Sequence, residues 1–220
     1  MRVVIAGTGT EIGKTHVTAC LLASGRAQGR RLAAYKPIAS GVADTCEDAE
    51  RHAQALEAAY VPPSFAYRRP VSPHLAAREE GRPIDLAVIR RRADEMAAGV
   101  DDLVIEAAGG LFTPLGDRVT NVELIQQLGL AHVVLVAPDR LGVLHEVGVC
   151  ITAARASNIQ IAAVVLSAPT EADDSTGTNA SELASLGLAA PIAGVFPRAR
   201  FDAPESRAVA TLLWMLLRDA

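Results

Sequence analysis

A glycine-rich loop near the start of the chain is the feature that most constrains the fold. The apolar run Val3-Val4-Ile5-Ala6 precedes Gly7-Thr8-Gly9-Thr10-Glu11-Ile12-Gly13-Lys14-Thr15, and a segment with helical periodicity follows. Such runs are typical of buried parallel strands, and glycines allow backbone N–H groups and a helix N-terminus to hold phosphates. The stretch predicts a phosphate-binding loop, with Lys14 on the outer phosphates and the Thr15 hydroxyl on Mg²⁺. The strict pattern has glycine where Thr8 stands, so the loop is one residue longer or starts differently, and a turn without a ligand is the alternative.

Length and composition bound the remaining possibilities. The chain has 220 residues, 50% of them hydrophobic, so we expect a single domain over residues 1–220. A net charge of −4 and the absence of a long basic cluster give no indication of nucleic-acid binding. No apolar run has the length of a signal peptide or a membrane span, and Cys20, Cys46 and Cys150 lack metal-type spacing. We therefore expect a cytoplasmic protein with reduced thiols and no membrane partner.

Strand and helix patterns alternate along the rest of the chain. Strands are expected at residues 3–6, 32–35, 103–106, 133–136, 161–166 and 192–196, and helices at 14–28, 48–59, 74–80, 84–97, 143–156 and 204–217. Residues 61–73 and 167–178 are expected to be irregular. The alternation predicts an α/β fold of the P-loop NTPase type, a mostly parallel sheet with helices on both faces. In such sheets ligands bind at the carboxyl edge of the strands.

Charged residues lie where two of these strands end. Lys36 directly follows the strand at 32–35, and it either projects over the sheet edge or is a solvated surface lysine. Glu106 ends the strand at 103–106, where a carboxylate is costly unless it meets Mg²⁺ or pairs with a lysine or arginine. Asp48 begins a helix and can cap it or bind a metal, with Asp44 and Glu47 as rivals.

Several segments together resemble dethiobiotin synthetases. They are Gly7 to Thr15, Tyr35-Lys36-Pro37-Ile38-Ala39-Ser40-Gly41, Ser72-Pro73-His74, Glu106 with Ala108-Gly109-Gly110, and Thr113-Pro114-Leu115. The likeness extends to at least Gly142, and the Lys-Pro-x-x-Ser-Gly segment is its most specific part. The resemblance implies a homodimeric, ATP- and Mg²⁺-dependent ligase that makes dethiobiotin from 7,8-diaminopelargonate and CO₂. The reaction would pass through a carbamate and a carbamic–phosphoric anhydride, with the substrate site near the dimer interface.

The resemblance also implies residue roles. Lys36, Lys14 and Thr10 would be catalytic, Ser40 would bind the substrate, and Thr15, Asp48 and Glu106 would hold the metal. The implied nucleotide-binding residues are Glu11, Ile12, Gly13, Lys14, Thr15, His16, Asp48, Glu106, Ala107, Ala108, Gly109, Ser167, Ala168, Pro197, Arg198 and Ala199. Lys36 is expected to act in the chemistry and not in folding, so Lys36→Met is expected to keep stability within about 1 kcal/mol.

The chain departs from the family pattern at three places. Ala107 replaces a usual glycine, and its methyl group is expected to crowd a ligand. His145-Glu146 stands where the family has Asn-His, which leaves open how the substrate carboxylate is bound. Ser167-Ala168 replaces an Asn-Asp pair that reads adenine, which leaves open the choice among ATP, CTP and GTP.

Three other functions are compatible with a phosphate loop. The synthetase domain of corrinoid amidation enzymes needs a glutaminase portion, for which 220 residues leave no room. A partitioning-type ATPase normally carries an additional early lysine in its loop, where this chain has Thr8 and Gly9. A nucleotide-binding module without catalysis is the third alternative. Rate constants and dimer contacts cannot be read from the sequence.

Overall fold

Six parallel strands form the main sheet of the protein. In this computed structural model, which describes residues 1–129, 131–187 and 190–219, their order is β10-β9-β8-β1-β5-β2. The strands are β10 (Ile192–Phe196), β9 (Ile161–Ser167), β8 (His132–Pro138), β1 (Arg2–Gly7), β5 (Asp102–Glu106) and β2 (Leu32–Tyr35). All six strands expected from the sequence are present, which confirms the α/β class with a parallel sheet.

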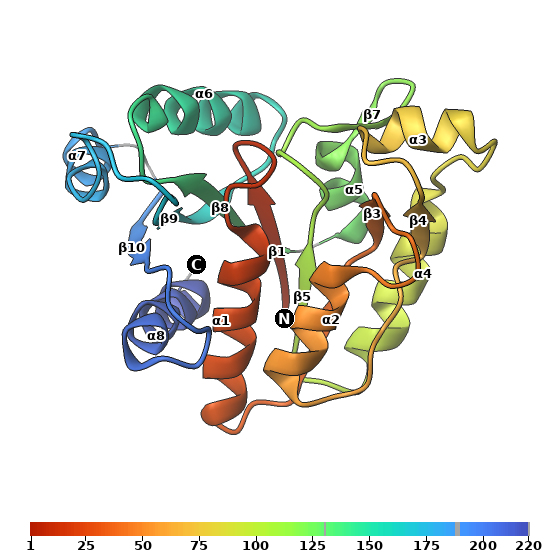
Figure 1. Cartoon of the computed structure of the whole chain (residues 1–220), viewed down its shortest axis with the longest axis horizontal. Coiled ribbons are helices and arrows are strands. Elements are labelled where there is room, and N and C mark those ends of the chain that lie inside the picture. The colour runs from red at the N-terminus through yellow and green to blue at the C-terminus, as the bar shows by residue number, and fades with distance from the viewer. Residues whose placement is uncertain (130, 188–189, 220) are drawn as a thin grey trace.

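Helices cover both faces of this sheet, because successive strand residues point to opposite sides. Val3 and Ile5 of β1 face a core built with α1 (Lys14–Ala27), α2 (Glu47–Leu56) and α8 (Pro204–Asp219). Val4 and Ala6 face the other core, which contains α3 (Pro73–Glu79), α4 (Leu86–Ala97), α5 (Asn121–Leu128), α6 (Val143–Ala156) and α7 (Asn179–Ser185). Figure 1 shows α1 between α8 and α2, so the helix that follows β1 lies in the centre of its face.

The short elements are those that the sequence did not predict. β3 (Ile38–Ser40) pairs with β4 (Phe65–Tyr67), and β6 (Pro114–Gly116) pairs with β7 (Val119–Thr120). Strands of two or three residues are too short to show periodicity, and β4 lies in a proline-rich segment that was expected to be irregular. Helices α5 and α7 were also missed, although a capping box of Thr120 and Glu123 marks the start of α5. Among the described residues, no helix is both long and apolar enough to cross a membrane.

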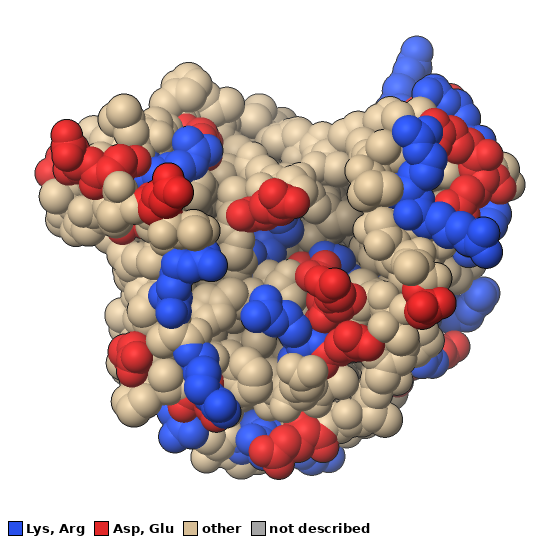
Figure 2. Space-filling model, in the orientation of Figure 1, with Lys and Arg blue, Asp and Glu red and all other residues tan. Residues whose placement is uncertain are grey.

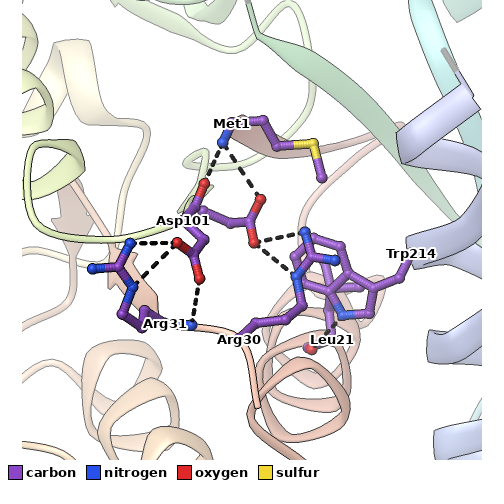
Figure 3. Close-up of polar contacts among 7 residues, drawn as sticks. Met1, Leu21, Arg30, Arg31, Asp101 and Trp214 are labelled. Carbon is purple, nitrogen blue, oxygen red and sulfur yellow. Dashed lines mark hydrogen bonds and ion pairs between the residues drawn. The ribbon is translucent and has the colours of Figure 1, made fainter. Parts of the chain in front are cut away.

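A polar cluster holds the amino-terminal edge of the sheet (Figure 3). The buried Asp102 carboxylate, at the start of β5, accepts from the Met1 amine and pairs with Arg30 at 2.7 Å. The Arg30 guanidinium also lies 4.2 Å from the ring centre of Trp214, whose Nε1 donates to the Leu21 carbonyl at 3.0 Å. β5 therefore carries a buried acid at each end, and the one at this end is fully engaged in structural contacts.

Candidate functional site

A cleft of about 1100 Å³ opens at the carboxyl edge of the sheet. The parallel register aligns the strand ends there: Ile5 of β1 lies opposite Glu106, and Tyr35 of β2 lies opposite Ile105. Lys36, the residue after Tyr35, is therefore brought beside Glu106. Figure 2 shows basic and acidic side chains next to one another around the hollow on this face. The strand ends meet here as expected for a ligand site in a parallel sheet.

The glycine-rich loop forms one wall of the cleft. It connects β1 to α1 through residues 8–13, and Gly13 precedes the helix in a left-handed conformation with φ of 94°. A side chain at Gly13 would lie 2.2 Å from the Ser167 hydroxyl, so the close approach of the loop to β9 requires glycine. Among the residues that the structure describes, no side chain caps α1, and the first turn of this helix holds no acid. The free N–H groups at this helix start form an anion site that faces the cleft.

Lys14 lies at the mouth of the loop. Its Nζ donates to the Gly9 carbonyl at 2.8 Å, so the side chain curls back over the loop instead of extending into solvent. Burial, and then the positive charge of Lys36, lower the pKa of Lys14 to about 8. Two ammonium groups thus face one site, and they are the only lysines of the chain. Bringing them together is unfavourable unless the site also receives anions.

Lys36 is the centre of a buried charge network. Its Nζ lies 2.6 Å from Glu106 Oε1 and 2.7 Å from Asp48 Oδ2. The Thr15 hydroxyl belongs to the same network, with Oγ1 lying 2.6 Å from Asp48 Oδ1 and 3.0 Å from Glu106 Oε1. Burial alone would lower the pKa of Lys36, but the charges of Glu106 and Asp48 outweigh it and raise that pKa above its ordinary value. Burial likewise opposes ionisation of Glu106, but Lys36 and His52 outweigh it and lower its pKa.

These contacts bear on what was expected of Lys36 and of the acid at the metal site. Lys36 is 5% exposed, so it is not a solvated surface lysine. Removing its charge would leave the 1%-exposed Glu106 carboxylate without its cation, which costs about 3–5 kcal/mol in comparable buried pairs. The buried pair therefore replaces the expectation that Lys36→Met leaves stability nearly unchanged with the prediction of a loss of this size. The network also favours Asp48 over Asp44, because the exposed Asp44 is not among the residues that line the cleft.

Most of the residues named from the sequence line this cleft. They are Thr10, Glu11, Ile12, Gly13, Lys14, Thr15, His16, Lys36, Ser40, Asp48, Glu106, Ala108, Gly109, Ser167, Arg198 and Ala199. Ser40 Oγ is a buried atom without a hydrogen-bond partner among the described residues, so the wall presents a hydroxyl that a ligand can satisfy. His16 donates from Nε2 to the Pro197 carbonyl at 2.8 Å, and burial is the main cause that lowers its pKa.

Three of the residues named as nucleotide-binding do not line the cleft: Ala107, Ala168 and Pro197. Ala107 follows Glu106 in an extended segment, so its side chain points to the opposite side and is fully buried in the core. The expectation that its methyl group crowds a ligand is therefore wrong, because that group lies in the core and not in the cleft. The Ala168 N–H is already bonded to the Phe196 carbonyl at 2.9 Å, and Pro197 uses its carbonyl on His16.

The acid at position 146 is neutralised within the chain. Arg140 donates to Glu146 Oε1 at 2.8 Å, and the Thr8 hydroxyl donates to Oε2 at 3.2 Å. Glu146 therefore connects the start of α6 with the glycine-rich loop. Thr8, the residue that breaks the strict loop pattern, makes this contact, and its N–H bonds to the Val136 carbonyl of β8 at 2.9 Å.

Other cleft residues were missed by sequence reasoning. Arg51 lines the cleft on α2, and no ion-pair partner is recorded for it within the described residues. His52 Nε2 donates to Glu106 Oε2 at 2.8 Å. Both lie three or four residues after Asp48, so they follow it on the same side of one helix. That spacing could have indicated both residues from the sequence. Thr113, also in the wall, accepts from the Gly110 N–H at 2.8 Å and orders the turn after β5.

The strand, the glycine-rich loop and the uncapped helix that starts with Lys14 and Thr15 define a P-loop NTPase-like nucleotide-binding protein. The Pyrococcus furiosus cell division ATPase MinD has this fold, with a TM-score of 0.62 and 12% identity over 100% of this chain and 99% of that one. The Aquifex aeolicus cell division protein MinD gives a TM-score of 0.54 at 13% identity, covering 100% and 98%. At these identities the likeness concerns the fold alone.

Sequence relatives are more specific. A family model described as an AAA domain matches residues 1–201. The ATP-dependent dethiobiotin synthetase BioD of Caulobacter vibrioides (strain NA1000 / CB15N) is 36% identical over 202 residues, 86% of this chain and 92% of the relative. That of Anaeromyxobacter dehalogenans (strain 2CP-C) is 35% identical over 214 residues, 95% of each. The chain belongs to the family of ATP-dependent dethiobiotin synthetases, and it is an ATP-dependent cyclo-ligase.

Proposed function

We propose that this protein closes 7,8-diaminopelargonate and CO₂ into the cyclic urea dethiobiotin, with conversion of ATP into ADP and phosphate. The observation that carries the proposal is the placement of a second buried ammonium, Lys36, across the cleft floor from the phosphate loop. A protein that only binds a nucleotide needs one lysine at its phosphates. A ligase also has to neutralise an anionic co-substrate beside the γ-phosphate, and a second ammonium in the same cleft supports that role for Lys36.

The proposed chemistry has three steps. One amine of the substrate adds to CO₂ and releases a proton, which gives a carbamate. A carbamate oxygen attacks the γ-phosphorus of ATP, the bond to ADP breaks, and a carbamic–phosphoric anhydride forms. The second amine then attacks the carbonyl carbon, closes the ring, expels phosphate and loses a proton. The protein contributes mainly by positioning the reactants and by neutralising charge.

The place of each residue in the cleft supports its proposed role. Lys14 and the free N–H groups of α1 would bind the β- and γ-phosphates. Lys36 would neutralise the carbamate and the transferred phosphoryl oxygens. The unpartnered Ser40 hydroxyl would bind the substrate. Thr10, on the exposed rim of the loop, would contact the reacting phosphoryl group.

Mg²⁺ fits the oxygen atoms that converge beside Lys36. Three oxygen atoms converge there, because Thr15 Oγ1 lies 2.6 Å from Asp48 Oδ1 and 3.0 Å from Glu106 Oε1. The ammonium of Lys36, 2.6 Å from Glu106 Oε1, is already bound by these acids. The described residues contain no group of three or more His, Cys, Asp or Glu that could hold a metal. Mg²⁺ suits such a site, because it is commonly bound by one or two carboxylates together with waters and phosphates. When bound, it would neutralise charge that develops on the phosphate oxygens.

The metal assignment predicts a difference between two aspartates. Asp48→Asn is expected to raise the Mg²⁺ concentration for half-maximal rate about tenfold or more, because it weakens one of two carboxylate ligands. Asp44→Asn is the matched control, since Asp44 lies in the loop just before α2 and outside the cleft lining, and it is expected to leave that concentration unchanged. The measurement is initial rate against Mg²⁺ at saturating ATP. A response of Asp44→Asn alone would contradict the assignment.

The function itself is tested by ADP release. Under the proposal, release depends on both 7,8-diaminopelargonate and bicarbonate, and dethiobiotin appears in equal amount. ADP release without the diamine would instead favour the second candidate, a partitioning-type ATPase, for which the likeness to the MinD proteins supplies fold-level support only. Nucleotide binding without turnover would indicate a module that lacks catalysis.

We also propose a homodimer that associates through α6. Leu141 and Val149 are 74% and 51% exposed, although both are large apolar residues. Val149 is part of a shallow hollow of about 450 Å³ on α6, which is lined by His145, Gly148, Val149, Thr152, Ala153 and Ala156. Contiguous apolar surface of this kind is typical of an interface. Light scattering is expected to give twice the chain mass for the unaltered protein and a smaller mass for Val149→Asp. A monomer in both cases would contradict the dimer.

The remaining proposals concern domain organisation and location. One domain is supported by the strand order, because β1, β2 and β5 share a sheet with β8, β9 and β10 from the second half of the chain. A cytoplasmic location is supported by the three free cysteines, Cys20, Cys46 and Cys150. Limited proteolysis that releases a folded fragment would contradict the first proposal, and recovery of the protein outside the cytoplasm would contradict the second.

A further inference from the structure

His52 is a buried histidine that faces the site from α2. Its exposed fraction is 3%, and it lies one helical turn after Asp48. Its Nε2 is 2.8 Å from Glu106 Oε2. A carboxylate only accepts hydrogen bonds, so the proton of this contact is on Nε2 and the imidazole donates. Its other ring nitrogen, Nδ1, is buried and has no hydrogen-bond partner among the described residues.

The two oxygens of Glu106 therefore have separate partners. Oε1 accepts from Lys36 at 2.6 Å and from the Thr15 hydroxyl at 3.0 Å, on the side of the phosphate loop. Within the described part of the chain, Oε2 accepts from His52 alone, on the side of α2. The terminal torsion of a glutamate is soft, so a carboxylate at a strand end can rotate unless both oxygens are held. His52 supplies the second fixed point.

A structural explanation for His52 is weak. A buried nitrogen without a partner costs about 1–3 kcal/mol, and an apolar residue of similar size would avoid that cost. The other buried positions of α2 are the small apolar residues Ala49 and Ala55. The polar side chain therefore carries an energetic cost, and it lies at the position of the helix that hydrogen-bonds Glu106.

We propose that His52 is a positioning residue that holds Oε2 of Glu106, so that Oε1 stays directed toward Thr15 and Asp48, where the Mg²⁺–nucleotide complex is bound. The inference rests on the metal role given to Glu106 under the proposed function. It assigns no chemical step to His52, which acts only through the glutamate.

Two substitutions separate positioning from packing. His52→Leu fills a similar volume without a donor, whereas His52→Gln retains an N–H donor at a comparable reach. Nucleotide affinity is measured by calorimetry over a series of Mg²⁺ concentrations, without the diamine, so that turnover is not required. His52→Leu is expected to raise the Mg²⁺ concentration that gives half of the maximal affinity about tenfold, the usual effect of removing a partner of a metal ligand. His52→Gln is expected to stay within about twofold of the unaltered protein.

Further variants make every outcome decisive. Glu106→Gln, measured in the same way, reports on the metal role itself, and an unchanged Mg²⁺ requirement there would overturn that role and the inference with it. If Glu106→Gln responds but His52→Leu behaves like the unaltered protein, only the positioning role is wrong. Equal melting losses in His52→Leu and His52→Gln with no change in Mg²⁺ requirement would show a packing role. If His52→Leu does not fold, His52→Asn, a polar side chain too short to reach Glu106, is expected to show the same tenfold rise, and its absence would overturn the proposal.

Discussion

Lys14→Ala is expected to reduce turnover by about a thousandfold or more and to weaken nucleotide binding about 10- to 100-fold. The first figure is the scale of losing a preorganised contact to a developing phosphoryl charge. The second corresponds to one charge-assisted hydrogen bond of about 1.5–3 kcal/mol. Lys14 is the only lysine of the loop, and its Nζ is held over the loop by the Gly9 carbonyl at 2.8 Å.

The matched control is Arg26→Ala, which removes one positive charge from the last turn of the same helix. Arg26 pairs with Glu57 at 2.8 Å on the surface, away from the cleft, so its loss is expected to leave affinity and rate unchanged. Titration calorimetry and a single-turnover assay provide the two measurements. Nucleotide affinity that is the same in Lys14→Ala as in Arg26→Ala would contradict the phosphate-loop assignment.

The two lysines also allow a direct spectroscopic check. Protein labelled with ¹³C at lysine Cε is expected to give two side-chain signals, because the chain has no other lysine. In the metal-free and nucleotide-free protein, the Lys14 signal is expected to titrate with a pKa of about 8, since burial and the charge of Lys36 disfavour its ammonium form. That signal is expected to be missing from the Lys14→Ala spectrum, and the Lys36 signal is expected not to titrate below its ordinary range.

Lys36→Met is expected to reduce turnover at least a hundredfold, roughly the loss of one strong electrostatic contact, and to lower the free energy of unfolding by about 3–5 kcal/mol. The loss of rate is expected because, under the proposed function, the ammonium neutralises the carbamate and the transferred phosphoryl oxygens. The loss of stability follows because Glu106 would stay buried without its closest cation. In the presence of Mg²⁺, nucleotide affinity is expected to fall less than in Lys14→Ala.

The two effects have to be measured on one preparation. A melting curve gives the stability loss, and the rate is then taken at a temperature where the variant is folded. Tyr35→Phe is the matched control, because it alters the preceding residue and removes a hydrogen bond to Ser64 at 2.5 Å without touching the cleft. Near-normal turnover of folded Lys36→Met would exclude Lys36 from the mechanism.

Much of the fold could be predicted from local patterns in the sequence. Each of the six main strands is a short apolar run in the sequence, because a strand that is buried on both faces needs apolar residues at nearly every position. The expected positions of these runs therefore agree with the strands of the structure. The phosphate loop is equally local, since its glycines, Lys14 and Thr15 act within nine residues. The short pairs β3–β4 and β6–β7 leave no such pattern, because strands of two or three residues are too short to show periodicity.

The sequence by itself determined that a phosphate loop, Lys36 and Glu106 each follow a strand, and hence that they share one edge of the sheet. Only the tertiary structure decided what they touch there. The parallel register places Lys36 beside Glu106, the alternation after Glu106 directs Ala107 into the core, and the docking of α2 brings His52 onto a carboxylate 54 positions further along the chain. These contacts depend on how separate segments pack, and side-chain direction at a strand end changes with a shift of a single residue, which no local pattern records.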